Sequence, residues 1–203
     1  MIRKTMWRIV LLAIGYALLG VLAQGLLAIP GYGAPFWPAA GLGLAAMLLW
    51  GKRCWPGIWL GSFVGSVGLE AYLTGHPSFL LPAMIASGAA LQGVVGARLT
   101  RRYLDLPAPL SRSQEVASFL VLGGPVACLL SASVAIGALV ATGRLSPDIV
   151  ATRWLTWWTG DSIGVLLCVP LVFLFLPGAR ILSRTRALPV TVPLLITGGL
   201  LLI

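Results

Sequence analysis

Residues 154–176 read WLTWWTGDSIGVLLCVPLVFLFL, and this stretch decides the fold class. It carries one charged side chain, Asp161, in a run long enough to cross a hydrocarbon core, which needs about 20 helical residues. The whole chain of 203 residues is 59% hydrophobic and 9% charged, whereas soluble domains usually carry about 25% charged residues. The composition therefore predicts an all-α integral membrane protein and excludes a soluble enzyme, a disordered chain and a secreted disulfide scaffold.

The apolar runs predict a polytopic transmembrane helix bundle with seven spans. The second run is short, so we expect either a crossing element or a broken helix there. The chain stops inside an apolar run, so we expect residues 1–203 to be one domain that is truncated at its C-terminal end. The predicted spans are 7–29, 38–51, 56–74, 79–99, 116–142, 154–176 and 188–203.

The positions of the basic residues predict the orientation. With seven crossings and a cytoplasmic N-terminus, all of the 14 Lys and Arg residues except Arg144 and Arg153 fall on the inner side. This is the bias that orients membrane proteins. We therefore expect a multi-pass membrane protein with a cytoplasmic N-terminus, and we read the net charge of +9 as a topology signal rather than as a nucleic-acid surface.

Metal and acid–base chemistry find little support in the sequence. His76 is the only histidine, and Cys54, Cys128 and Cys168 lie far apart without metal-ligand spacing. No HExxH motif is present, and residues 160–164, GDSIG, match the spacing of GxSxG but lie inside a predicted membrane span. We expect no catalytic residue, no metal and no cofactor.

Small residues and prolines mark candidate packing and hinge positions. Gly57, Gly61 and Gly65 recur every four residues, which lets a neighbouring helix approach closely. That neighbour is either another helix of the same chain or a second copy in a homodimer. Gly124-Pro125 and Pro170 interrupt apolar runs and predict kinks, which serve either as hinges or as fixed geometry.

Asp161 is the candidate sensing or ligand-binding residue, because it is the only acid well inside a predicted span. An acid there is costly unless it has a partner or a polar cavity. Either it forms part of a ligand, ion or proton site, or it makes a buried hydrogen bond that fixes helix packing. Helical spacing places three tryptophans on its stripe, and two further residues are candidates from other segments. These companions are Trp154, Trp157, Trp158, Trp37 and Gln92. We expect Trp37 to line a cavity with Trp157 or Trp158.

Three motifs resemble one known family. They are FWPAAG at 36–41, GKRCWPGIWLG at 51–61 and WLTWWTGDSIGVL at 154–166, with Pro170 following. In this order they resemble the membrane-associated sensor domain of the first MASE type, over almost the whole chain. The resemblance implies about eight spans, the eighth beyond Ile203, in a multi-pass protein of the bacterial inner (cytoplasmic) membrane. It also implies an N-terminal sensory module of bacterial signalling proteins, followed by a histidine kinase or a diguanylate cyclase (GGDEF) domain.

The leading hypothesis is therefore a non-enzymatic signal-input domain. Its expected partners are the lipid bilayer, a cytoplasmic output domain in the same full-length chain, a second copy in a homodimer, and a small ligand or membrane protein. The alternative is a small-molecule transporter or a substrate-binding membrane subunit, since broken helices and a buried acid occur in that class too. An intramembrane enzyme is the least favoured class, because one histidine and one buried acid offer few groups for acid–base chemistry.

Overall fold

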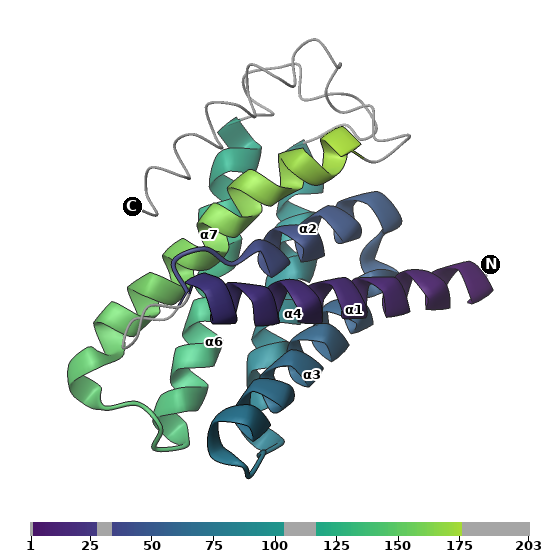
Figure 1. Cartoon of the computed structure of the whole chain (residues 1–203). Coiled ribbons are helices and arrows are strands. Elements are labelled where there is room, and N and C mark those ends of the chain that lie inside the picture. Colours follow the sequence, from purple (N-terminus) through teal and green to yellow (C-terminus); the bar gives the residue numbers. More distant parts are fainter. Residues whose placement is uncertain (1, 28–33, 104–116, 176–203) are drawn as a thin grey trace.

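The computed structural model describes residues 2–27, 34–103 and 117–175, and within these ranges it is helical with no strand. A π-helix, η2, leads directly into α6, and two short 3-10 turns, η1 and η3, precede α3 and α7 (Figure 1). The α-helices are α1 (Ile2–Leu27), α2 (Pro38–Trp50), α3 (Trp55–Thr74), α4 (Leu80–Tyr103), α6 (Ala127–Ala141) and α7 (Val150–Phe175). The remaining elements are η1 (Lys52–Cys54), η2 (Phe119–Val126) and η3 (Pro147–Ile149).

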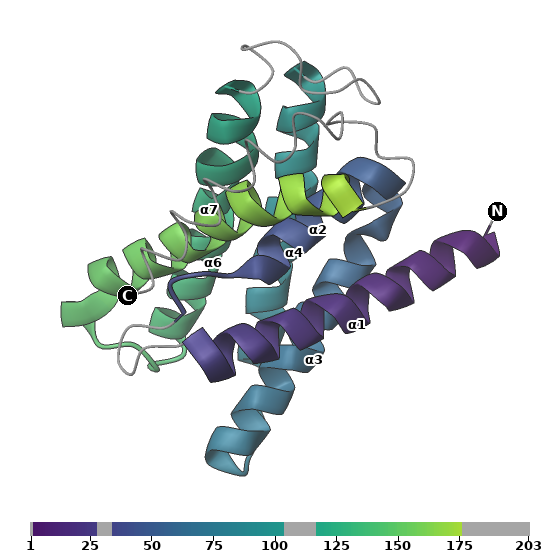
Figure 2. The ribbon, with the colours of Figure 1, turned by 45° about the horizontal axis from the view of Figure 1, so that its top comes forward.

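The helices form a closed ring. Going round it, α1 packs on α3, α3 on α4, α4 on α6, α6 on α7, α7 on α2, and α2 again on α1. Figures 1 and 2 show α1, α2 and α7 side by side, with α4 and α6 crossing behind them. Because α2 also contacts α4 across the ring, it lies at the centre of the molecule.

The central helix α2 is short and buried on nearly every side. Its residues from Ala39 to Leu48 are buried except Leu42, which is half-buried. A helix that is apolar all round belongs in an interior. Pro38 is well suited to its first turn, and Gly51 ends it with a φ of +90°, which favours glycine.

The prediction of seven spans is wrong for the described residues. Four segments are long and apolar enough to cross a membrane, namely Arg3–Leu27, Leu80–Arg102, Phe119–Ala141 and Pro147–Phe173. The helix α2 has 13 residues, or about 20 Å, against a core of roughly 30 Å. In α3, glycine, serine and Glu70 dilute the apolar character. The predicted span 188–203 and the eighth span lie outside the described residues.

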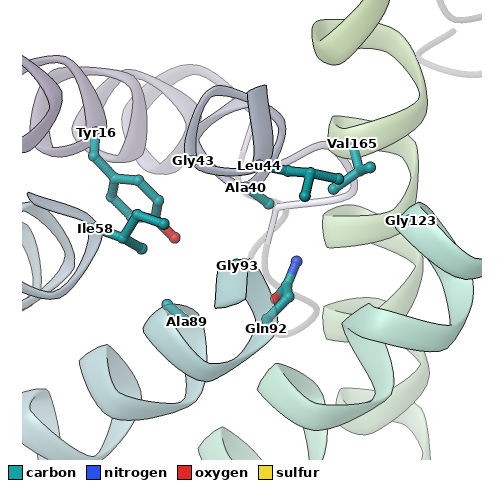
Figure 3. A pocket seen from close by; sticks show the side chains of 10 residues that line it. All are labelled: Tyr16, Ala40, Gly43, Leu44, Ile58, Ala89, Gln92, Gly93, Gly123 and Val165. Atoms are coloured by element: carbon teal, nitrogen blue, oxygen red, sulfur yellow. The ribbon is translucent and has the colours of Figure 1, made fainter. Parts of the chain in front are cut away.

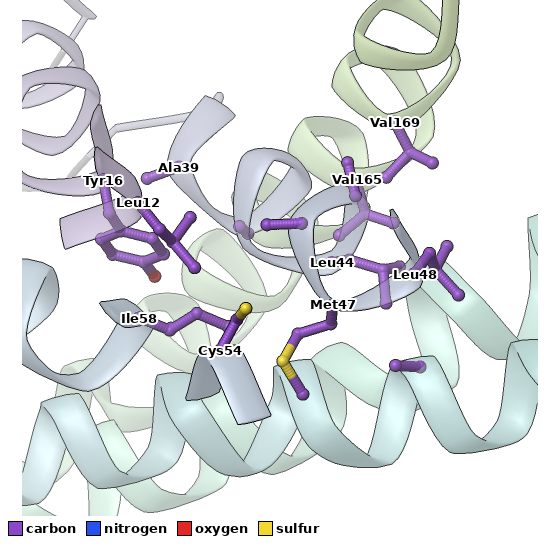
Figure 4. Close-up of a cluster of buried hydrophobic side chains, with 14 of the residues drawn as sticks. Leu12, Tyr16, Ala39, Leu44, Met47, Leu48, Cys54, Ile58, Val165 and Val169 are labelled. Atoms are coloured by element: carbon purple, nitrogen blue, oxygen red, sulfur yellow. The ribbon is translucent and has the colours of Figure 1, made fainter. Parts of the chain in front are cut away.

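A hydrophobic core fills the space where α1, α2, α3 and α7 meet. Figure 4 shows Leu12 and Ile58 close to Tyr16, with Leu44 and Val165 further along the same core. The opposite face of α1 is apolar but uncovered, and a lipid bilayer would cover it. Its exposed side chains include Met6, Leu18 and Leu26.

The glycine stripe of α3 packs inside the molecule. A Cβ atom at Gly57 would lie 2.8 Å from the carbonyl oxygen of Ile9, and one at Gly61 would lie 2.5 Å from that of Ala13. Both distances are far below ordinary contact, so the missing side chains are what allow α1 and α3 to touch. Because α1 covers this stripe, the stripe is not free to bind a second copy of the chain.

Candidate functional site

Asp161 lies in α7 and is 3% exposed. Three side chains from other helices interact with it, namely Tyr16 of α1 and Cys128 and Ser131 of α6. Gln92 of α4 joins them through its hydrogen bond to Cys128. We call these five residues the polar cluster. All five are buried, so a group of polar side chains is enclosed inside an otherwise apolar bundle.

Hydrogen bonds connect most of the polar cluster. Ser131 is a hydrogen-bond partner of the Asp161 carboxyl, and its Oγ accepts a bond of 3.3 Å from the indole Nε1 of Trp157. Gln92 Nε2 donates to Cys128 Sγ at 3.1 Å. The bonds cross between α4, α6 and α7, so the state of the cluster is linked to how these helices pack.

The three tryptophans beside Asp161 tie α7 to its neighbour in the ring. Trp158 Nε1 donates to the carbonyl oxygen of Pro125 at 2.8 Å, and Trp154 Nε1 donates to Ser133 Oγ at 3.2 Å. Together with the Trp157 bond, these give a row of indole donors along η2 and α6. The rings of Trp154 and Trp158 also stack, with centroids 6.0 Å apart. The indole N–H groups of these candidate sensing residues therefore form hydrogen bonds between helices, and their role in sensing stays a prediction.

The FWPAAG stretch crosses α7 directly beside Asp161. The backbone N–H of Trp37 donates to the carbonyl oxygen of Gly160 at 3.0 Å. A Cβ at Gly164 would lie 1.9 Å from the carbonyl oxygen of Trp37, and a Cβ at Gly41 would lie 2.2 Å from that of Gly164. Two motifs far apart in the sequence thus meet backbone against backbone, which only glycine permits.

The indole of Trp37 packs toward α1. It is a hydrogen-bond partner of Tyr16, and a Cβ at Gly20 would lie 3.4 Å from its ring. The expected cavity shared with Trp157 or Trp158 stays a prediction. Through Tyr16, Trp37 still joins the edge of the polar cluster.

A cavity of about 10 Å³ lies next to the cluster. Tyr16 and Gln92 both reach toward it, as Figure 3 shows, and the rest of its lining is apolar or glycine, including Gly43, Leu44 and Val165. This space holds about one water molecule. This cavity is thus too small for an organic solute.

The predicted kink at Gly124-Pro125 is a π-helical segment, η2, with Pro125 inside it. A Cβ at Gly123 would lie 2.9 Å from Thr100 Oγ1, so η2 packs tightly on α4. Such segments arise where the regular ladder is interrupted, and they are frequent at functional sites. Pro170 is buried in α7, which continues through it to Phe175. The hinge role of both positions stays a prediction.

The far end of α2 is held by a basic side chain. Arg101 Nη2 of α4 donates to the carbonyl oxygens of Met47 and Leu48 at 3.0 and 2.7 Å. A cation at a helix C-terminus also complements the helix dipole. The guanidinium of Arg8 lies 5.8 Å from the ring centroid of Trp50 at the same end. The helix α2 therefore runs from the α7 crossing beside Asp161 to a basic end of the bundle.

Sequence reasoning missed Tyr16, Cys128 and Ser131. Each is a polar or polarisable residue inside an apolar run, which is a detectable signal, but nothing local shows that it turns toward Asp161. Asp161 and Gln92, which were predicted, belong to the same cluster.

Comparison with known proteins agrees with the motifs. The model of the MASE1 family matches residues 6–202, which is nearly the whole chain. Comparisons with curated proteins and with solved structures find no match. The predicted resemblance is confirmed, and the chain belongs to the MASE1 family of membrane-associated sensor domains.

Proposed function

We propose that this chain is the membrane-embedded signal-input domain of a bacterial signal-transduction protein. In this proposal it is a multi-pass domain of the inner membrane with a cytoplasmic N-terminus, and it performs no chemistry itself. It passes a signal to a cytoplasmic histidine kinase or GGDEF domain in the same full-length chain. Membership of a sensor-domain family supports the input role.

The observation that carries the proposal is the polar cluster around Asp161. A buried acid within a membrane-spanning helix is expensive and commonly marks a functional site. Here it joins helices from the beginning, middle and end of the described chain. A ligand that changes the preferred packing at this point would shift the whole ring, provided that it binds one arrangement more tightly than the other.

The helix α2 is the proposed route from the cluster to the cytoplasmic side. One end crosses α7 at Gly160 and Gly164, and the other end is held by Arg101. Because α2 is buried nearly all round, a movement of α7 at the crossing displaces α2 as a unit. The basic residues at its far end support a cytoplasmic location for that end.

The test is the substitution Asp161→Asn in the full-length protein. We expect output to lose its response to the stimulus, because Asn keeps the shape of the side chain and removes its charge. Output is measured as phosphoryl transfer for a kinase or as cyclic dinucleotide synthesis for a GGDEF domain. Asp148→Asn is the matched control, since Asp148 is exposed and accepts a hydrogen bond from Ser146. A full response in Asp161→Asn would reject the role of the cluster.

A further inference from the structure

The charge of Asp161 has no protein counterion within the described ranges. The ion pair of the described residues joins Arg144 to Glu70 at another place in the fold. Arg153 lies on the same helix as Asp161, eight positions earlier, which is about 12 Å along the axis. It makes no ion pair with Asp161 in the structure.

The elements packed around Asp161 offer neutral groups at its level. The segments 38–50 and 119–126 contain no titratable side chain. From α6 the titratable group is Cys128, and from α1 it is Tyr16, since Arg3, Lys4 and Arg8 belong to the first turns of that helix. From α4 the basic residues Arg98, Arg101 and Arg102 stand at its final turns, and Gln92 is the cluster member. The charged or titratable groups of α7 and η3 are Cys168, Arg153 and Asp148.

The neutral side chains nearest to Asp161 offer oxygen atoms as ligands. Ser131 Oγ pairs with the Asp161 carboxyl while accepting from Trp157. Gln92 donates a hydrogen bond from its Nε2 to Cys128 Sγ, so its Oε1 is the atom that accepts hydrogen bonds. The hydroxyl of Ser162, beside Asp161 in the chain, is buried and makes no hydrogen bond of good geometry with the described residues. An isolated buried carboxylate is unstable in an apolar medium, and the group that neutralises it must come from outside the chain.

The available space limits what that group is. The cavity of about 10 Å³ beside the cluster is lined by Tyr16 and Gln92 and not by Asp161 or Ser131, and its size admits no more than a water molecule or a bare ion. Resting on the proposed sensory role of this cluster, we infer that Asp161 and Ser131 form a binding site for a monovalent cation, either a proton or a sodium ion. The two ions share one chemistry, since both neutralise a single carboxylate.

The test is the thermal unfolding of the purified chain in detergent. Sodium chloride is titrated against choline chloride at constant ionic strength, on both sides of neutral pH. If the ion is sodium, the Tm of the wild-type chain rises by roughly 5–10 °C at a hundredfold excess over Kd. If it is the proton, sodium has no effect and the Tm falls as the pH rises, because losing the proton leaves a buried charge. Either dependence is absent from Asp161→Asn.

A pair of serine variants keeps the test decisive if Asp161→Asn does not fold. Ser131 and Ser133 lie on the same helix and each accepts a hydrogen bond from an indole. Only Ser131 faces Asp161. We expect Ser131→Ala to raise the half-saturating cation concentration about tenfold, a change of about 1.4 kcal/mol in binding free energy, and Ser133→Ala to leave it unchanged.

Two outcomes overturn the inference. One is a Tm that depends on neither sodium nor pH, and the other is an equal dependence in wild type and in Asp161→Asn. The unfolding experiment does not measure signalling output, so its result is independent of the proposed sensory role. The two following outcomes combine it with the output measurement proposed above for Asp161→Asn. A cation effect with unchanged output in Asp161→Asn would retain the site and reject the signalling function. Lost output without a cation effect would do the reverse.

Discussion

Two helix contacts in this molecule depend on glycine, but they join different kinds of segment. Between α1 and α3, the stripe Gly57 and Gly61 lets one regular helix lie on another. Between α2 and α7, Gly160 and Gly164 admit the non-helical residues that lead into α2. The second contact adds a backbone hydrogen bond from Trp37 to Gly160 and lies directly beside Asp161.

The comparison shows that a close helix contact also includes backbone hydrogen bonds when one of its partners is an irregular segment. A regular helix has its N–H and carbonyl groups paired within itself. The N–H of Trp37, just before Pro38, has no such partner, so it donates to the carbonyl oxygen of Gly160 in α7. A change at the α2–α7 crossing should therefore disturb both packing and hydrogen bonding, whereas one at the α1–α3 contact should disturb packing alone.

The largest effect is expected from Gly164→Ala. The new Cβ would lie 1.9 Å from the carbonyl oxygen of Trp37, a backbone atom that cannot rotate away. We expect a loss of about 4 kcal/mol or more in the free energy of unfolding, at the severe end for a single substitution. Chemical unfolding in detergent measures it, and Gly68→Ala is the control because nothing lies within 4 Å of its added Cβ. Equal stability of the two variants would refute the tight crossing.

Gly61→Ala should have a smaller effect, of about 2 kcal/mol. Its Cβ would lie 2.5 Å from the carbonyl oxygen of Ala13, and the helices can separate slightly without losing a hydrogen bond. The same unfolding experiment applies, with Gly65→Ala as its partner, since that Cβ meets ordinary contacts from 3.7 Å. If Gly61→Ala were as damaging as Gly164→Ala, the distinction between the two contacts would disappear.

Trp158→Phe should have the smallest effect, of about 1 kcal/mol, the net value of a typical hydrogen bond. It removes the indole donor that reaches the carbonyl oxygen of Pro125 and keeps an aromatic ring. Trp154→Phe is the comparison, since Trp154 donates to the hydroxyl of Ser133 in a more exposed place. If Trp154→Phe lost as much free energy of unfolding as Trp158→Phe, the burial of each indole would not determine how strongly its hydrogen bond stabilises the protein.

Sequence reasoning succeeded where the signal is local. Asp161 stands out because a charge in an apolar run is visible without knowing any neighbour. The spacing of Gly57 and Gly61 likewise indicates a close helix contact. Reasoning failed on the spans, because apolar character was taken as a sign of crossing, whereas α2 is apolar through burial by other helices.

The sequence by itself determined the class of this protein: helical, membrane-embedded, with one acid inside a span and a family signature in three motifs. These properties follow from composition and from the 3.6-residue period, which act within a single helix. Only the tertiary structure decided that Tyr16 and Ser131 face Asp161, and that Trp37 packs against α1. The physical reason is that such contacts depend on the order and rotation of helices around the ring, which arise from packing between distant segments.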